Sequence, residues 1–237
     1  KILAAIADIL KHEACEGMTT AELDMRAEIL MAKHDVIPSF KGYQGFPAVT
    51  CMSVNEEIVH AIPGKRKLQD GDLLKIDIGI IHKGYQTDHA VIALIGNVKP
   101  EVRKFADVTV EALFKGIEQV KPGNKTGDIG HAVQKHVESH GYSIVREFTG
   151  NGIGKNMHEP PEIPNFGKKN QGYVLIPGMT ICVEPIVAMG ERFSLTLNDG
   201  WTAVTRDGSF ACQAEHTILV TDSGYEILTL LPLTPDP

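Results

Sequence analysis

The chain has 237 residues, of which 43% are hydrophobic and 22% charged, and its formal net charge is -7. This composition is ordinary for a globular protein, and the length suffices for one large core or two small ones. The negative balance, with lysine and arginine scattered along the chain, argues against nucleic acid or an anionic membrane as the main partner. No apolar stretch is long enough to span a bilayer and no basic, apolar leader opens the chain, so we expect a cytoplasmic protein.

The first predicted element is a helix. Apolar residues recur at helical spacing from Ile2 to Leu10, so this helix is expected to be under way already at Lys1. The four cysteines of the chain form no CxxC pair, and we expect them to be reduced thiols.

An internal repeat organises the rest of the chain. Residues 17–23 read G-M-T-T-A-E-L and residues 123–129 read G-N-K-T-G-D-I, which is one phrase, G-x-x-T-x-[DE]-[IL], written twice. In each copy a threonine is predicted to cap a helix of about 15 residues whose first turn carries an acid. A predicted strand pair comes after each helix. We therefore predict an α+β chain that forms a single domain over residues 1–237, with pseudo-twofold related halves at about 1–115 and 116–237.

Four acidic residues, Asp77, Asp88, Glu184 and Glu215, lie inside apolar runs that have the composition of strands. An ionised carboxylate in such surroundings must find a cation, find several donors or stay protonated. A shared pair of divalent ions would satisfy all four, whereas the alternative is four unrelated surface or capping acids. The runs are LLKIDIGII (73–81), YQTDHAVIALI (85–95), MTICVEPIVAM (179–189) and ACQAEHTILV (211–220).

The first two acids belong to one predicted hairpin. Its turn falls near residues 82–84, and a loop of even length would place Asp77 and Asp88 on one face, opposite or one diagonal step apart. Two like charges that close would repel by roughly 4 kcal/mol at an effective dielectric of 20, which a bound cation would relieve. Oxygen-rich ligation favours Mn, Mg or Fe(II) over a thiolate-type zinc site. The second pair of acids is more widely spaced, which predicts an insertion around residues 190–208.

Two histidines are candidates for catalysis. The segment GNGIGKNMHEPP (150–161) combines three glycines and two prolines with His158, which suits backbone held close to a ligand. His60 ends an apolar stretch just before a turn, where it could line the same cavity. A lone histidine is more often an ordinary core residue, and it is the neighbouring carboxylates that favour a functional interpretation.

The remaining candidates are weaker. His136 and His140 have the helical i, i+4 spacing of a ligand pair but lack the glutamate of the zincin motif, so we interpret them as a solvated helix face. His216 should point away from the face that carries Glu215. Cys51 lies near the proposed site, but nothing in the sequence indicates a low-pKa thiol, so it is expected to pack rather than to act as a nucleophile.

Six segments stand out in chain order: GYQGFPAVTCMSVNEEIVHAIPG, GDLLKIDIG, GYQTDHA, GNGIGKNMHEPP, MTICVEPIV and DGWTAVTRDGSFACQAEHTILVT. Together, over about residues 17–222, they resemble the type I methionine aminopeptidases. The resemblance implies the pita-bread (creatinase/aminopeptidase) fold, with two αβ halves around a dinuclear site for divalent Mn, Fe, Co, Mg or Zn. It also implies removal of the initiator methionine from the N-terminal peptide of nascent proteins, which is compatible with a position close to the ribosome.

The resemblance further implies roles for the acidic residues. Asp77 would bind one metal ion, Glu184 would bind the other, and Asp88 and Glu215 would bridge both. Glu184 would also take part in catalysis by accepting and returning a proton.

By the same resemblance, two histidines would assist Glu184. His60 and His158 would contact the substrate and the tetrahedral intermediate. A methionine pocket suited to a thioether would complete the site. The substrate-binding residues would be Tyr43, Phe46, Cys51, His60, Met157, His158 and Trp201.

Asn151 departs from the family pattern. The sequence reads G-N-G-I-G where the family has G-H-G-I-G with a metal-ligating histidine. An amide oxygen is a weaker ligand than imidazole for transition metals, and it reaches only to about the depth of the ring Nδ1, so either water fills the gap or the metal shifts. Two hypotheses result: a weakened metal-dependent aminopeptidase, or an impaired or inactive pita-bread protein that binds peptide N-termini or a protein partner. Prolidase-like enzymes, which carry an additional N-terminal domain, are disfavoured by the short region before the first motif.

Overall fold

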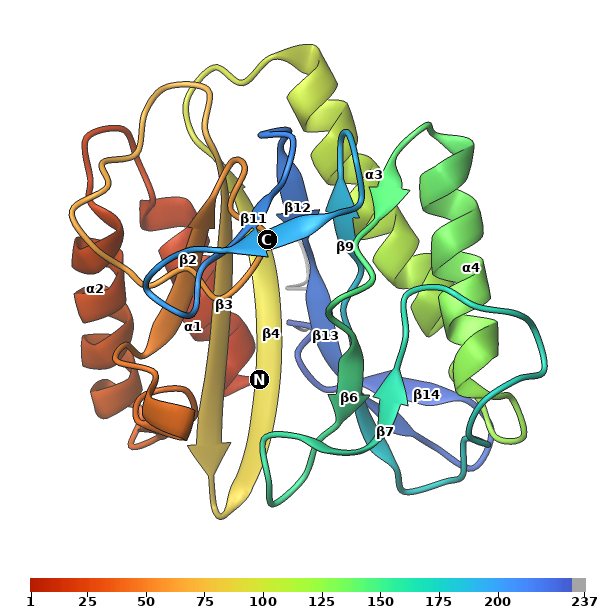
Figure 1. The fold of residues 1–237 in the computed structure, drawn as a ribbon. Helices are drawn as coiled ribbons and strands as arrows, with labels where there is room; N and C mark the ends of the chain where they lie inside the picture. The colour runs from red at the N-terminus through yellow and green to blue at the C-terminus, as the bar shows by residue number, and fades with distance from the viewer. Residues whose placement is uncertain (232–237) are drawn as a thin grey trace, which may run out of the picture.

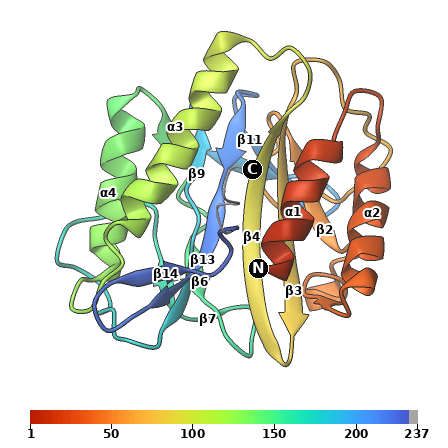
Figure 2. The ribbon, with the colours of Figure 1, turned by 180° about the vertical axis from the view of Figure 1, so that it is seen from behind.

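A curved antiparallel sheet, with helices covering its back, forms the frame of the computed structural model, which describes residues 1–231 (Figures 1 and 2). The predicted α+β class is confirmed. The helices are α1 (Ile2–Glu13), α2 (Thr20–Lys33), α3 (Pro100–Ile117) and α4 (Thr126–Ser139), with a 3-10 turn η1 at Tyr43–Gly45. Within the described part of the chain, none of these helices is long and apolar enough to cross a membrane.

The strands form one large sheet and two small ones. β2 (Thr50–Val54) and β14 (Tyr225–Ile227) pair at the sides of the large sheet with β3 and β13. The small sheets are β12 (Ala211–Gln213), β9 (Ile186–Ala188) and β5 (Ser143–Ile144), and the hairpin β10 (Ser194–Thr196) and β11 (Ala203–Thr205). The large sheet runs in the order β1 (Ile37–Pro38), β3 (Leu73–His82), β4 (Tyr85–Leu94), β13 (Glu215–Val220), β8 (Thr180–Val183), β6 (Gly150–Gly152) and β7 (Glu159–Ile163).

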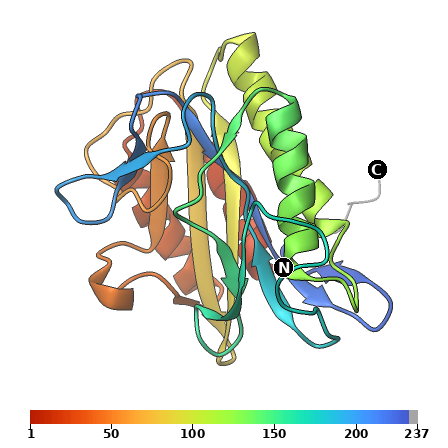
Figure 3. The ribbon, with the colours of Figure 1, turned by 45° about the vertical axis from the view of Figure 1, so that its right-hand side comes forward.

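The hairpin β3–β4 has the predicted turn. Lys83 and Gly84 connect the strands with φ values of 51° and 80°, as a two-residue type I′ turn requires. Along β3, Ile76 and Ile78 point into a core formed with α1 and α2, which leaves Asp77 on the opposite face because side chains alternate along a strand. In Figure 3 the red helices α1 and α2 lie behind the orange and gold strands.

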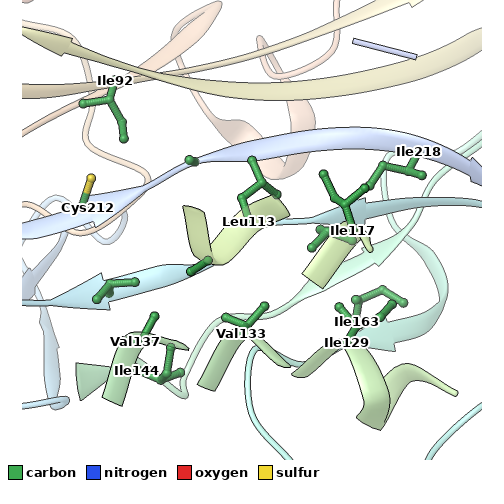
Figure 4. Close-up of a cluster of buried hydrophobic side chains, with 14 of the residues drawn as sticks. Ile92, Leu113, Ile117, Ile129, Val133, Val137, Ile144, Ile163, Cys212 and Ile218 are labelled. Atoms are coloured by element: carbon green, nitrogen blue, oxygen red, sulfur yellow. The ribbon is translucent and has the colours of Figure 1, made fainter. Parts of the chain in front are cut away.

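A second core lies between the other helix pair and the sheet (Figure 4). Leu113 and Ile117 of α3 and Val133 of α4 pack with Ile181 of β8 and Ile218 of β13. The spacing of these apolar residues along the helices is the i, i+3, i+4 pattern of an amphipathic face. Each half of the sheet is therefore backed by its own helix pair.

The repeated phrase begins both α2 and α4, but the predicted capping holds only for α2. Thr19 accepts a hydrogen bond from the Glu22 backbone N–H at 3.2 Å, and the Glu22 carboxylate accepts one from Thr19 N at 2.7 Å. Lys125 occupies the corresponding position before α4 and has no acceptor to offer, so the prediction of a threonine cap there is wrong. The Asp128 carboxylate still accepts a hydrogen bond from Lys125 N at 2.8 Å.

The threonine that the two copies share is buried in the first turn of each helix. Thr20 Oγ1 accepts a hydrogen bond from Gly64 N at 2.8 Å, and Thr126 Oγ1 accepts one from Tyr173 N at 3.3 Å. In each copy the threonine thus fixes the helix to a loop about 45 residues further along the chain. Two related halves are expected to show matched contacts of this kind.

Two of the predicted strands are interrupted. The run at 179–189 divides into β8 and β9 at Glu184 and Pro185, and the run at 211–220 divides into β12 and β13 at Ala214. Proline has no backbone N–H to donate and is therefore disfavoured in the interior of a sheet, away from its edge strands. Consequently the chain leaves the large sheet after β8 and returns at Glu215, with the predicted insertion in between.

Strands β4 and β13 join the two parts of the sheet through a short ladder. Their register pairs Ala90 with Glu215 and His89 with His216. The Thr217 hydroxyl extends the contact, because it donates to Asp88 O at 2.7 Å and accepts from Asp88 N at 2.9 Å. The seam therefore lies next to two of the predicted metal ligands.

Candidate metal centre

Three buried carboxylates converge where the two parts of the sheet meet. Asp77, Asp88 and Glu215 are 8%, 8% and 2% exposed, and one oxygen from each lies within 4.8 Å of the others. In the hairpin register Asp77 pairs with Ala90 and Asp88 pairs with Gly79, so the two aspartates are diagonal neighbours on one face, as predicted.

The fourth predicted ligand, Glu184, is not in this cluster of three. It lies at the end of β8, where a buried glutamine connects it to the others: Gln213 Nε2 donates to Glu184 Oε2 at 3.0 Å and approaches Asp77 Oδ2 at 3.4 Å. Gln213 was not among the predicted site residues. Gln213 lies two residues before Glu215, and this spacing could have identified it as a site residue, since alternate residues of a strand share a face.

The order of the strands gives the four acids a symmetrical arrangement. Asp88 and Glu215 come from the central strands β4 and β13, whereas Asp77 and Glu184 come from the flanking β3 and from the end of β8. The two central acids are thus placed between the two outer ones.

Burial raises the pKa of every acid in the group, and repulsion between the carboxylates adds to it for Asp88, Glu184 and Glu215. Burial raises the pKa of Asp77 to about 6, although the hydrogen bond from Gln213 acts in the opposite direction. Burial, and then the charge of Asp77, raises the pKa of Glu184 to about 8. The pKa values of Asp88 and Glu215 lie well above their usual range for the same reasons. The group therefore holds more negative charge than its surroundings can stabilise.

The donor atoms fit divalent metal ions. Among residues 1–231, the buried atoms Asp77 Oδ1 and Gln213 Oε1 have no hydrogen-bond partner. Buried polar atoms without partners are costly, and carboxylate oxygens converging on one place are the ligands of divalent ions such as Mn²⁺ and Mg²⁺. Asp77, Asp88 and Glu215 are the residues best placed to hold such an ion.

Asn151 lies on β6 with its amide group oriented by the backbone. The Nδ2 group donates to Gly152 O at 2.9 Å and to Met157 O at 3.1 Å. Because both Nδ2 protons are used in these hydrogen bonds, the amide oxygen Oδ1 remains free to bind a cation. Asn151 is thus an oxygen donor whose amide group is oriented by the backbone.

The two candidate catalytic histidines are held by aromatic neighbours. His158 Nδ1 lies 2.8 Å from the Tyr43 hydroxyl, and the two rings are 5.4 Å apart. The His60 ring meets Phe148 edge to face at 5.4 Å, and His60 has a left-handed φ of 59°. Burial, and then the proximity of His158, lowers the pKa of His60 to about 4; burial also lowers the pKa of His158. At neutral pH the His60 ring is therefore uncharged.

Five of the seven predicted substrate-binding residues, all except His60 and His158, lie in one apolar cluster. Phe46 and Trp201 meet edge to face at 5.0 Å, although they are distant in the sequence. Phe40 was not predicted to belong to the pocket, and its ring lies over Gly79 so closely that a Cβ there would come within 2.8 Å of it. The cluster consists of Phe40, Phe46, Ala48, Cys51, Ile153, Met157 and Cys182, with Tyr43, Ile62 and Trp201 packed against it.

The weaker candidates have structural roles. Burial, and then the charge of Asp77, raises the pKa of Cys51 well above its usual range, which argues against a nucleophilic thiolate. His216 points away from the Glu215 side chain, as predicted, and stacks on His89 with ring centroids 4.7 Å apart. The four cysteines, all within the described range, are free thiols.

A sheet built from two helix-backed parts, with acids meeting at its seam, defines a pita-bread protein with a candidate metal centre. The model of metallopeptidase family M24 matches residues 1–222. The chain belongs to that family, and the predicted fold is confirmed.

Similar proteins agree with this assignment. A methionine aminopeptidase of Clostridium acetobutylicum is 47% identical over 97% of this chain and 92% of that protein. The crystal structure of methionine aminopeptidase from Rickettsia prowazekii is 39% identical, with a TM-score of 0.96 over 97% of this chain and 93% of that one. A prolidase from Pyrococcus horikoshii OT3, at 23% identity and a TM-score of 0.76 over 97% of this chain and 58% of that one, shares the fold.

Proposed function

We propose that this protein is a metal-dependent aminopeptidase that removes the N-terminal methionine from nascent proteins in the cytoplasm. The observation that carries the proposal is the convergence of Asp77, Asp88 and Glu215, buried and underpartnered, close to an apolar cluster. The names of the similar proteins support the same activity.

We propose two divalent ions as cofactors, drawn from Mn, Fe, Co, Mg and Zn. Asp88 and Glu215 would contact both, Asp77 would contact one, and Glu184 with Asn151 would contact the other. When bound, such ions polarise the scissile carbonyl and lower the pKa of the attacking water. Of the candidate metals, hard ions suit the all-oxygen donor set of this chain best.

Glu184 is the proposed proton carrier. As a residue it is more exposed than the three converging acids. Gln213 holds one of its oxygens, which leaves the other to take a proton from water and return it to the leaving amine.

His158 and His60 are the proposed donors to the reacting amide. If the Tyr43 hydroxyl donates to His158 Nδ1, the ring keeps its proton on Nε2 and presents an N–H donor to the substrate. His60, uncharged because of its lowered pKa, likewise carries one N–H. Two such donors would stabilise the negative charge that develops on the carbonyl oxygen.

The apolar cluster would select the first residue of the substrate. Met157, Phe46 and Trp201 offer a thioether and two aromatic rings, surfaces to which a methionine side chain adapts well. Activity should therefore require an N-terminal methionine. Comparable cleavage of Leu-, Lys- and Met-initiated peptides of otherwise identical sequence would contradict this part of the proposal.

Asn151 favours a second candidate function, an impaired member of the family that binds peptide N-termini or a protein partner. Its Nδ2 group is engaged with Gly152 and Met157, so only the amide oxygen would stand in for the nitrogen donor that the resemblance implies for the ion at Glu184. One of the two metal sites should then be weaker than the other.

Replacement of Asn151 by histidine distinguishes the two candidates. Hydrolysis of Met-Ala-Ser and calorimetric metal titration would be measured for the unsubstituted chain and for Asn151→His. Loss of an outer contact to a metal ligand typically costs about 10 to 100-fold, so restoring a direct ligand should raise kcat more than tenfold at saturating metal and tighten the weak site. Asn156→His, at an exposed residue between β6 and β7, is the matched control and should change neither quantity.

Two results would alter the proposal. Measurable hydrolysis by the unsubstituted chain with unchanged kcat and stoichiometry in Asn151→His would show that Asn151 is a competent ligand or a bystander. Absence of hydrolysis in both proteins, with N-terminal peptides still bound, would favour the binding function.

A further inference from the structure

A second cluster of metal-ligating side chains lies on the helices, away from the sheet seam. Glu111 of α3, His136 of α4 and His140, which directly follows α4, each place one ligand atom within 4.8 Å of the others. Figure 2 shows α3 and α4 side by side on the back of the molecule. The interpretation of the two histidines as a solvated helix face is incomplete, because the His136 side chain is only 17% exposed and a neighbouring helix adds the glutamate.

The rings of the two histidines are oriented for a ligand. His140 Nδ1 lies 2.8 Å from the backbone carbonyl of His136, to which it donates, so the lone pair of this ring is on Nε2. The ring centroids of the pair are 4.6 Å apart. A hydrogen bond from Nδ1 to a backbone carbonyl is the usual arrangement that orients a metal-binding histidine.

His136 has a buried nitrogen that its neighbours do not satisfy. Its Nε2 lies 3.1 Å from Glu111 Oε2, but within the described residues this atom has no aligned hydrogen-bond partner. The contact therefore brings the two atoms together without the geometry of a good hydrogen bond. An ion placed between them would use both.

The donor set defines the class of ion. Two imidazoles and one carboxylate, with coordination positions left open to water, suit Zn²⁺, and the stability order of divalent metals favours Cu²⁺ still more. Ligand atoms on one such ion lie about 3.4 Å apart, because each bond is about 2.0–2.2 Å long. The Glu111 side chain is 58% exposed and can rotate to close the remaining distance. Lys115, the nearest cation on α3, is already paired with Glu118 at 3.1 Å.

We propose that Glu111, His136 and His140 form a mononuclear site for Zn²⁺ or a related transition-metal ion that fastens α3 to α4. The site differs chemically from the seam, where carboxylate and amide oxygens predominate. The inference does not depend on the proposed peptidase activity, since it uses residues from the opposite side of the helix layer.

The test uses the intact protein with the seam first saturated with Mg²⁺. Zn²⁺ would be added by calorimetric titration, and Cu²⁺ would be followed by electron paramagnetic resonance. We expect Cu²⁺ to show coupling to two imidazole nitrogens. His140→Gln and His136→Gln should each remove one nitrogen and weaken Zn²⁺ binding at least tenfold. His131→Gln, on the same helix but outside the cluster, is the matched control and should leave both signals unchanged.

Thermal unfolding supplies an independent measurement. Zn²⁺ bound across two helices should raise the unfolding temperature of the unsubstituted chain and of His131→Gln by more than it raises that of His140→Gln. His140 is exposed at the end of α4, so its replacement is not expected to disturb folding. Equal Zn²⁺ affinity in the unsubstituted chain and both cluster variants, or Cu²⁺ without the two-nitrogen pattern, would overturn the proposal.

Discussion

Asp77 and Asp88 lie inside one uninterrupted hairpin, whereas Glu184 and Glu215 lie at the ends of strands that pair over only four positions. In the hairpin β3–β4 every residue from Leu73 to Tyr85 is either in the ladder or in the turn. Strand β8, by contrast, stops beside Glu184, and the chain leaves the sheet until β13 begins.

The continuous hairpin and the interrupted strands therefore contribute to the site in different ways. The continuous hairpin holds its two carboxylates rigidly, because both strands are paired on each side of them. The strands next to Glu184 and Glu215 pair over fewer positions, and the chain between them, residues 186–213, brings in Gln213 and Trp201. One side of the seam is therefore a fixed platform for ligands, and the other also builds the surroundings of the substrate.

The largest expected effect comes from the two acids at the seam. Asp88→Asn and Glu215→Gln should each weaken metal binding by more than about 100-fold, because a bridging ligand serves both ions. Asp77→Asn, which removes a ligand of one ion, should cost less. Calorimetric titration of the three variants measures the difference. Equal losses would show that the seam acids do not bridge.

The second prediction concerns pH. The folded pKa values of these acids are raised, so without metal the folded protein keeps protons that the unfolded chain has lost, and the acids lower stability as pH rises. For Asp77 the window is about pH 4 to 6, and the cost is about 3 kcal/mol. For Glu184 the window extends to about pH 8. Bound metal should remove this loss.

Urea unfolding of metal-loaded and metal-free protein checks the pH prediction. The difference in free energy of unfolding between them should widen from pH 6 to pH 8. The lowered pKa of His60 makes the free energy of unfolding rise with pH between about pH 4 and 6.5. This contribution is the same in both samples, so it cancels in the difference between them. A difference that stays constant with pH would mean that the acids are not neutralised by the metal.

A smaller effect is expected at the residue that connects the two sides. Gln213→Leu removes the donor shared by Glu184 and Asp77, and should lower metal affinity or kcat by about 10 to 100-fold with little change in KM. Gln171→Leu, at an exposed glutamine, is the control. If KM rises while kcat and metal affinity are unchanged, Gln213 positions the substrate rather than the acids.

The smallest effect is expected at Lys75, which is fully buried beside the seam and donates to Asn55 O at 3.0 Å. Burial lowers the pKa of Lys75 to about 8, so its deprotonation should raise stability by about 1 kcal/mol between pH 8 and pH 9. Lys75→Met should abolish that rise, and Lys104→Met, at an exposed lysine, should not. Urea unfolding at the two pH values measures it, and an unchanged rise in Lys75→Met would assign it to another group.

The hairpin geometry could be predicted from local sequence. Alternation along LLKIDIGII and the two-residue turn at Lys83 and Gly84 place Asp77 and Asp88 on one face whatever the rest of the chain does. The repeat likewise marked the starts of α2 and α4 correctly, although it misassigned the cap of α4. Features that depend on neighbours in the chain were thus accessible without a structure.

Contacts between distant segments were not accessible in this way. Glu111 is remote in sequence from His136 and His140, and only the packing of α3 on α4 brings it to them. Gln213 likewise reaches Glu184 only because Pro185 and Ala214 interrupt their strands and fold the chain back. Strand periods, turns and the kinds of donor atom could be predicted from the amino acids alone, because these features depend on local geometry and chemistry. Which of these donor atoms come into contact depends on long-range packing, so those contacts are seen only in the tertiary structure.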